Sequence, residues 1–359
     1  MFKYKQILIL VTGSMLFLSG CSTAGLGRVQ QTRGSYNTAL NQSDNEQFLL
    51  NIARMRFDRS PFFVGVDSIT AQTTLTYRSG IDDTKFGSQS AQGVSGAWWN
   101  LQPNIEFKQT PTVTYSPLQG TSYISGLLSP VNITQFNYLI QTNISIAIAF
   151  KLAVDNIGSL SNMADTWEHD GSDGPSSGSE FSDFVTYLDQ ERVIEGMYLF
   201  ETSYKGGDAL VIISKSNDVA AKISKMLHLD KTYNRIILSS SLAQKTAGNV
   251  VQFRTRSFFA ILNFLSYSID LSEQDIKKYG ISDNVSDAQY KDLMQGLFKL
   301  KSSDSSPVNA YAKVSYEGKW YYIDNGDVYS KATLMFLKLI YSLEAGEVSV
   351  NPFGSVAAP

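Results

Sequence analysis

The feature that most limits how this chain can fold is its single cysteine, Cys21. One thiol cannot close a disulfide within the chain, so the fold must be held by packing and hydrogen bonds alone. The chain has 359 residues, of which 43% are hydrophobic. A chain of this length and composition can bury a substantial core, and we expect one large domain or two ordinary ones.

A short leader precedes the cysteine. Lys3 and Lys5 form a basic start, and residues 7–18 form an apolar run. This run is too short to span about 30 Å of hydrocarbon comfortably, which is typical of a secretory signal peptide rather than of a membrane-spanning helix. Residues 1–20 are therefore predicted to be a leader that is removed.

The end of the leader predicts a lipid anchor. Leu18, Ser19, Gly20 and Cys21 match the pattern at which bacterial envelope proteins are acylated, for example with palmitate, and cut before the cysteine. The alternative is a chance thiol in an ordinary secretory leader. Several acyl chains on Cys21 would hold the protein firmly at a membrane. Because Ser22 is not an aspartate, which usually retains such proteins at the inner membrane, we expect the periplasmic side of the outer membrane.

The charge balance argues against nucleic acid as a partner. The formal net charge is −3, and it becomes more negative when the leader with its two lysines is removed. No stretch of clustered Lys and Arg could follow a phosphate backbone.

The composition divides the mature chain into segments. Residues 21–42 are polar and predict a flexible tether, and residues 159–180 predict an acidic Gly/Ser linker or loop. Residues 43–158 and 181–345 predict an N-terminal and a C-terminal α+β domain, and residues 346–359 a tail. The predicted fold class is α+β, with mixed or antiparallel sheets packed with helices.

Local patterns place the elements. Ser43 and Glu46 are spaced as a capping box and predict that a helix begins there. Strand patterns occupy 62–77 and 105–115, and Pro111 predicts an edge position for the second strand. Further strands are predicted at 193–201, 209–214, 235–239, 250–255 and, as a hairpin, at 311–323. Helices are predicted at 133–140, 144–157, 181–190, 218–227, 257–269, 283–300 and 330–343.

The long polar segment 78–102 contains Trp98 and Trp99. Loops of this length are either functional or disordered. The two tryptophans are candidate partner contacts, reaching a protein, a polymer or a membrane interface, but aromatic residues often fold under their own loop.

The sequence offers little for catalysis. Its only histidines are His169 and His228, and neither has a neighbour at metal-ligand spacing. Glu191 and Glu195 are close enough to share a helix face and could act as a carboxylate pair, although such pairs usually lie on a solvated surface. We expect no enzyme, no catalytic residue, no cofactor and no metal.

Four segments resemble a family of proteobacterial outer-membrane lipoproteins. They are residues 62–69, residues 111–118, residues 254–265, and residues 320–324 together with 330–333. Within this family the chain is most similar to the accessory lipoprotein of the Dot/Icm type IVB secretion system, a part of its outer-membrane core complex. The resemblance implies a non-catalytic role, with other secretion-system or envelope proteins as partners in a large oligomeric assembly. A binding module for peptidoglycan or another polymer is the alternative, and an envelope hydrolase is a third possibility.

Overall fold

The structure is a computed structural model, and it describes residues 21–79, 103–142, 145–162, 177–240, 248–281 and 293–345. They form two compact units. The described residues of Met1–Pro61 and Gly120–Ser349 make up the larger unit, and those of Phe62–Gln119 the smaller one. Helices occur together with mixed and antiparallel sheets, so the predicted α+β class is confirmed.

A six-stranded sheet with the order β4-β3-β8-β7-β6-β5 organises the larger unit. Its strands are β3 (Val154–Ile157), β4 (Leu160–Ser161), β5 (Met197–Tyr204), β6 (Gly207–Ser214), β7 (Arg235–Ser239) and β8 (Val250–Thr255). Only β7 and β8 run parallel, while all other neighbours are antiparallel.

This sheet corrects the predicted domain boundaries. Strand β3 belongs to the segment 43–158 and its neighbour β8 to the segment 181–345, so the two predicted domains share one sheet. A pairing between residues about a hundred positions apart leaves no mark on local composition. The polar segment 159–180 therefore resembled a linker in the sequence although the strands on both sides of it belong together.

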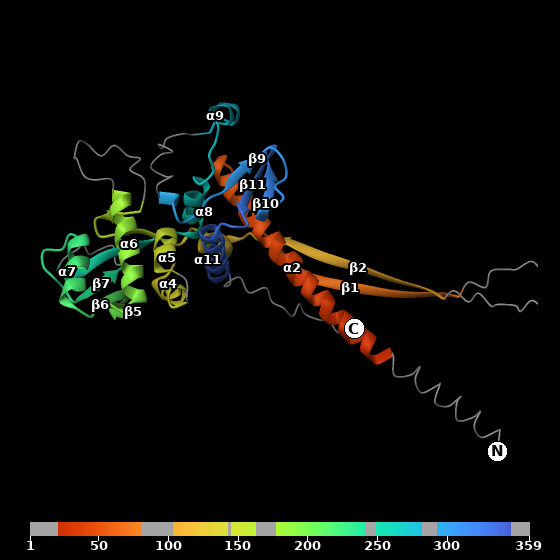
Figure 1. Cartoon of the computed structure of the whole chain (residues 1–359), viewed down its shortest axis with the longest axis horizontal. Coiled ribbons are helices and arrows are strands. Elements are labelled where there is room, and N and C mark those ends of the chain that lie inside the picture. Colours follow the sequence, from red (N-terminus) through yellow and green to blue (C-terminus); the bar gives the residue numbers. More distant parts are fainter. Residues whose placement is uncertain are drawn as a thin grey trace, which may run out of the picture. The chain divides into compact units, whose positions relative to one another are not determined.

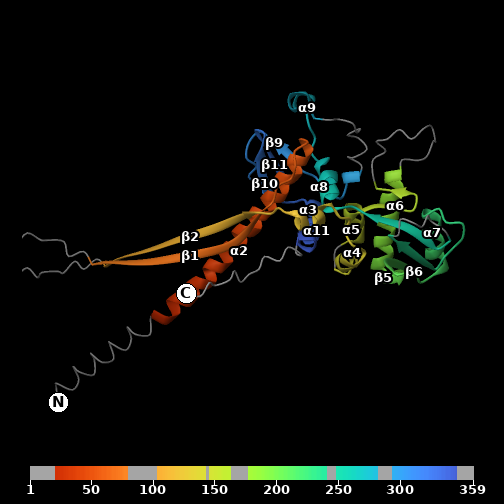
Figure 2. The same ribbon diagram turned by 180° about the vertical axis from the view of Figure 1, so that it is seen from behind.

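Four helices pack against this sheet or beside it. They are α4 (Ile133–Ile140), α5 (Ile146–Ala153), α6 (Ser177–Val193) and α7 (Asn217–Met226). Figures 1 and 2 show α6 and α7 beside β5 and β6. The helix predicted at 181–190 is confirmed within α6, and its apolar residues are fully buried: Phe181, Phe184, Val185 and Leu188.

The rest of the larger unit packs against the second half of helix α2 (Cys21–Arg56), where the buried residues begin at Asn45. The helices α3 (Thr121–Leu128), α8 (Phe258–Ser266), α9 (Glu273–Tyr279) and α11 (Val328–Ala345) accompany it, with a sheet of order β10-β11-β9. Its strands are β9 (Lys301–Ser303), β10 (Ala310–Tyr316) and β11 (Lys319–Asp324), of which β10 and β11 confirm the predicted hairpin. In the core, the Tyr341 ring packs edge-on against Phe48, and Phe48 also meets Phe258.

Helix α2 also corrects the predicted tether. Residues 21–42 are helical, and the helix continues through Ser43 without a new start. No proline interrupts the chain before Pro61. The helical hydrogen bonding of the buried part can therefore continue toward Cys21, because adding a residue to an existing helix is easier than starting a new one. The capping box at Ser43 is not used, because the carbonyl groups of the preceding helical turn already serve its N–H groups.

Two other predicted helices are shorter than expected. The segment 144–157 ends as a helix at Ala153, and β3 begins at Val154, where the backbone turns to pair with β8. In the segment 283–300, residues 283–292 lie outside the described residues, and those from Leu293 onwards do not form a continuous helix. Gly296 has a positive φ of 68° there, a conformation that ends helices.

Arg256 ties α5 to the sheet from inside the core. Its side chain is buried, and its Nη1 donates to the carbonyl oxygens of Lys151 at 2.9 Å and Leu152 at 3.1 Å. Nη2 donates to the carbonyl oxygen of Asn162, and the guanidinium lies 3.9 Å from the centre of the Phe264 ring. The last carbonyls of a helix have no partner within the helix, so a buried cation here satisfies groups that would otherwise cost stability.

The smaller unit is a two-stranded ribbon made of β1 (Val64–Ser79) and β2 (Pro103–Pro117). The two strands lie side by side along their length (Figure 1). The strand pattern at 62–77 forms one long strand rather than two short ones. The edge position predicted from Pro111 is confirmed, since each strand of a two-stranded sheet is an edge.

Candidate functional site

The structure says little about the residues predicted for lipid anchoring and partner contact, which are Cys21, Trp98 and Trp99. Cys21 is the first residue of α2, and the structure describes its backbone only. Trp98 and Trp99, and with them most of the segment 78–102, lie outside the described residues. Lipidation of Cys21 and partner contact by the tryptophans stay predictions.

His228 has neighbours that the sequence did not reveal. It follows α7 with a left-handed backbone, and its Nδ1 lies 3.0 Å from the Ser159 hydroxyl oxygen. Its Nε2 lies 4.0 Å from a carboxylate oxygen of Glu180, which is beyond hydrogen-bonding distance. The imidazole is 56% exposed, so water competes for both nitrogens. The three residues have the types of a Ser–His–carboxylate site without its geometry. His169 lies outside the described residues.

Glu191 and Glu195 do not form the carboxylate pair that their spacing allowed. Helix α6 ends at Val193, and Glu195 has a left-handed backbone in the turn that follows. Glu191 is buried beside Gly196, where an added Cβ would come within 2.0 Å of its Oε2. Burial of the Tyr187 hydroxyl, together with the hydrogen bond and negative charge of Glu191, raises the pKa of Tyr187 to about 12.

Glu195 instead makes a surface ion pair. Its carboxylate lies 3.3 Å from the Nζ of Lys215, which also sits 4.6 Å from the centre of the Tyr198 ring. The two carboxylates thus occupy different environments and serve different partners. The expectation that they share a helix face is wrong, because Gly196 and the turn before it redirect the chain into β5.

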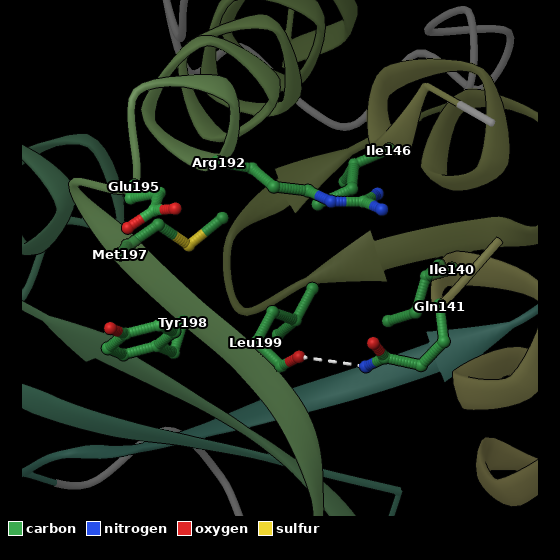
Figure 3. Close-up of a pocket in the computed structure, with 8 residues that line it drawn as sticks. All are labelled: Ile140, Gln141, Ile146, Arg192, Glu195, Met197, Tyr198 and Leu199. Carbon is green, nitrogen blue, oxygen red and sulfur yellow. Dashed lines mark hydrogen bonds between the residues drawn. The ribbon is translucent and has the colours of Figure 1, made fainter. Parts of the chain in front are cut away.

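A cavity of about 320 Å³ lies between the ends of α4 and α6 and the start of β5. Figure 3 shows the Arg192 guanidinium extending toward Ile146, and Gln141 reaching Leu199. Gln141 donates to the Leu199 carbonyl at 3.2 Å, and Arg192 donates to the Thr142 carbonyl at 2.9 Å. The Gln141 amide and the Arg192 guanidinium therefore hydrogen-bond to the protein's own backbone. These bonds connect the end of α4 to the edge strand β5 and to α6.

Exposed apolar side chains gather beside this cavity. Val193 and Ile194 at the end of α6 are 78% and 71% exposed, and Tyr198 and Phe200 on β5 are also exposed. Strand β5 is the last strand of its sheet, and among the described residues it pairs only with β6. Exposed apolar groups beside a sheet edge are typical of protein contact surfaces.

The β1–β2 ribbon is a long two-stranded sheet. Its strands have 16 and 15 residues, a length of about 50 Å at about 3.3 Å per residue. The pairing runs from Val64 opposite Pro117 to Ser79 opposite Pro103, with one irregularity between Val66 and Ser68. Within the described part of the chain, neither strand pairs with a third. An isolated two-stranded ribbon is at best marginally stable in water, so its faces or edges require further contacts.

The two faces of the ribbon differ in composition. Residues directly opposite one another share a face. Between positions 69 and 77 the register puts five pairs on one face, of which Thr73–Gln109 is polar and four are largely apolar: Ile69–Val113, Ala71–Pro111, Leu75–Phe107 and Tyr77–Ile105. The pairs of the other face are polar: Ser68–Thr114, Thr70–Thr112, Gln72–Thr110, Thr74–Lys108 and Thr76–Glu106. The sequence predicted these strands but not their mutual register, on which this division depends.

Searches for metal sites and membrane spans gave no candidate in the described ranges. They contain no group of three or more His, Cys, Asp or Glu that could hold a metal ion. Nor does any helix in them have the length and apolar character needed to cross a membrane.

The comparisons with known proteins found no counterpart. No family model, no curated protein and no solved structure matches this chain. The resemblance seen in the sequence motifs therefore stays a prediction.

Proposed function

We propose that this protein is a non-catalytic structural lipoprotein of an outer-membrane protein assembly, and specifically of the core complex of a type IVB secretion system. In this role the lipid on Cys21 holds the protein at the inner face of the outer membrane. The larger unit and the ribbon contact other proteins of the assembly.

The observation that carries the proposal is the β1–β2 ribbon. Fifteen residue positions of β2 pair along β1, yet within the described residues no other strand joins them. Within the described residues the outer edges of both strands are unpaired over about 50 Å, and long unpaired edges favour association with another chain. The exposed Val193 and Ile194 beside the β5 edge supply a second surface for a neighbouring chain.

The test is to purify the full chain from detergent-solubilised envelopes through a C-terminal tag and to identify what accompanies it by mass spectrometry. We expect a fixed set of outer-membrane and periplasmic proteins in constant ratio. The variant Cys21→Ser should lose acylation and recover these partners several-fold less, because membrane anchoring raises the effective concentration at which the proteins meet. Ser19→Ala is the matched control, because it keeps a small residue in the processing motif.

Two results would contradict the proposal. Purification of the chain without stoichiometric protein partners would remove the assembly role. If the chain instead sedimented with isolated peptidoglycan after extraction of all other proteins, the polymer-binding alternative would replace it. Fatty-acid labelling of Cys21→Ser equal to that of the natural sequence would refute the anchor separately.

A further inference from the structure

The two outer edges of the ribbon differ in their backbone chemistry. The Leu118 N–H donates to the Phe63 carbonyl at 3.0 Å. Leu118 directly follows β2, so an even-numbered position of this strand directs its N–H toward β1. Hydrogen-bonding direction alternates along an antiparallel strand. The odd-numbered positions of β2, and by the register the odd-numbered positions 69–77 of β1, therefore direct their N–H and C=O groups outward.

The outer edge of β2 is blocked. Its three prolines, Pro103, Pro111 and Pro117, all occupy odd-numbered positions. Proline has no N–H, so a strand approaching this edge would find no donor at its two ends or near its middle. Glu106 and Lys108 add charges, another device by which edge strands avoid pairing.

Between Ser68 and Tyr77 the outer edge of β1 has none of these protections. Residues 68–77 contain no proline, no glycine and no charged residue. Their outward positions are Ile69, Ala71, Thr73, Leu75 and Tyr77, each with an N–H and a C=O to offer. A long, uncharged edge of this kind pairs readily with another strand, and natural proteins seldom leave one uncovered.

We propose that β1 pairs antiparallel with β1 of a second copy of this chain, around a two-fold axis at Thr73, to form a four-stranded sheet β2-β1-β1-β2. This register places Ile69 opposite Tyr77 of the second copy, and Ala71 opposite Leu75. Aromatic and β-branched residues form favourable cross-strand pairs. The five outward positions exchange about ten hydrogen bonds with the second copy.

Charge and closure both favour a second copy as the occupant. Asp67 and Arg78 lie near opposite ends of β1, so antiparallel pairing sets the acidic end of one copy beside the basic end of the other. The resulting sheet has β2 at both outer edges, and both are blocked by prolines. An interface between identical patches is closed by its symmetry, and here no open edge remains for further growth.

The inference deepens the proposed function, on which it rests for treating the ribbon as an interface. It names the first partner as this chain itself. The two ideas can fail separately, since a chain that joins the assembly without self-pairing would remove the dimer and leave the assembly role.

One cross-strand pair supplies a matched cross-linking test in the full chain. Thr73 and Gln109 lie directly opposite each other in the ribbon, one at the open edge and one at the blocked edge. In the dimer the two Thr73 Cα atoms are about 5.5 Å apart, within the range that a disulfide spans. After oxidation of envelopes, Thr73→Cys should give at least about tenfold more disulfide-linked dimer than Gln109→Cys, as read on a non-reducing gel. Equal cross-linking, or none, would overturn the proposal.

The same two positions give a second test that needs no cross-link. Thr73→Pro removes an outward N–H at the centre of the open edge, whereas Gln109→Pro removes one from an edge that is already blocked. In sedimentation of the detergent-purified full chain, Gln109→Pro should remain dimeric and Thr73→Pro should become monomeric. A dimeric Thr73→Pro chain would refute pairing through β1, and so would a Gln109→Pro chain that is equally monomeric.

Discussion

Replacing Arg256 by methionine tests whether the buried guanidinium holds the end of α5 to the sheet. The substitution keeps an unbranched side chain of similar length but removes every donor. The carbonyl oxygens of Lys151, Leu152 and Asn162 then lose a charged hydrogen bond. The Lys151 oxygen keeps a second donor, because the side-chain amide of Asn162 also reaches it, at 2.7 Å.

The loss therefore falls on two carbonyl groups, those of Leu152 and Asn162. A buried acceptor that loses its partner costs about 1–3 kcal/mol, which gives about 2–6 kcal/mol for the pair. The destabilisation expected for Arg256→Met is about 4 kcal/mol. For a unit of this size, about 2–4 °C per kcal/mol converts this into a fall in Tm of about 8–16 °C.

Arg254→Met is the matched control; Arg254 lies in β8, two residues before Arg256, which follows the end of that strand. Arg254 is 50% exposed, and its Nε lies 2.7 Å from an Asp155 carboxylate oxygen. Surface ion pairs contribute about 0–1 kcal/mol, so this variant should melt within about 4 °C of the natural sequence. Thermal unfolding of both purified variants followed by circular dichroism makes the comparison. If Arg256→Met and Arg254→Met had the same Tm, the Arg256 guanidinium would not be holding α5 to the sheet, and the reasoning from its contacts would be refuted.

Three further predictions concern the core, pH and the anchor. Leu262 is buried and Phe259 is 38% exposed. In denaturant titration, Leu262→Ala should therefore lower the free energy of unfolding by about 2–5 kcal/mol, and Phe259→Ala by much less. Equal effects would contradict the placement of α8. The hydrogen bond from Lys319, with one from Ser272, holds the pKa of Asp275 below that of a free aspartate, so the ionised carboxylate stabilises the fold. The difference in unfolding free energy between the natural sequence and Asp275→Asn should be largest near neutral pH and should shrink as pH falls below about 4. Urea titrations at several pH values measure this difference, and a difference that does not change with pH would contradict the prediction. Cys21→Ser should keep its leader and incorporate no clickable fatty acid, and a labelled variant would refute lipidation.

Local pattern predicted much of the secondary structure. Strands β7 and β8 have the bounds that their β-branched residues indicated, at 235–239 and 250–255. The apolar stripe of the helix predicted at 257–269 is buried as expected, at Phe258, Ile261, Leu262 and Leu265. In each of these elements the residues that set the pattern also form the core, so the tertiary structure reinforces the local preference.

Long-range contacts were beyond the reach of such patterns. The pairing of β3 with β8 and the burial of Arg256 depend on residues about a hundred positions apart. A charged residue in a strand indicates solvent unless its partners are known, and here the partners are backbone carbonyls, which every residue type carries. The neighbours of His228 could not be predicted for the same reason, since Ser159 and Glu180 of α6 are far from it in the sequence.

With the lipid anchor proposed at Cys21, the length of helix α2 would set the distance between the membrane and the larger unit. Lys338 of α11 donates to Asn41 at 2.8 Å and to Asn45 at 2.9 Å, which marks where the helix meets the rest of the larger unit. The twenty residues from Cys21 to this point span about 30 Å as a helix and about 66 Å when extended. Glycines weaken this part of the helix, at Gly25, Gly27 and Gly34. If Cys21 carries the proposed lipid, unwinding of this stretch would let the distance between the bilayer and the larger unit vary between about 30 Å and about 66 Å.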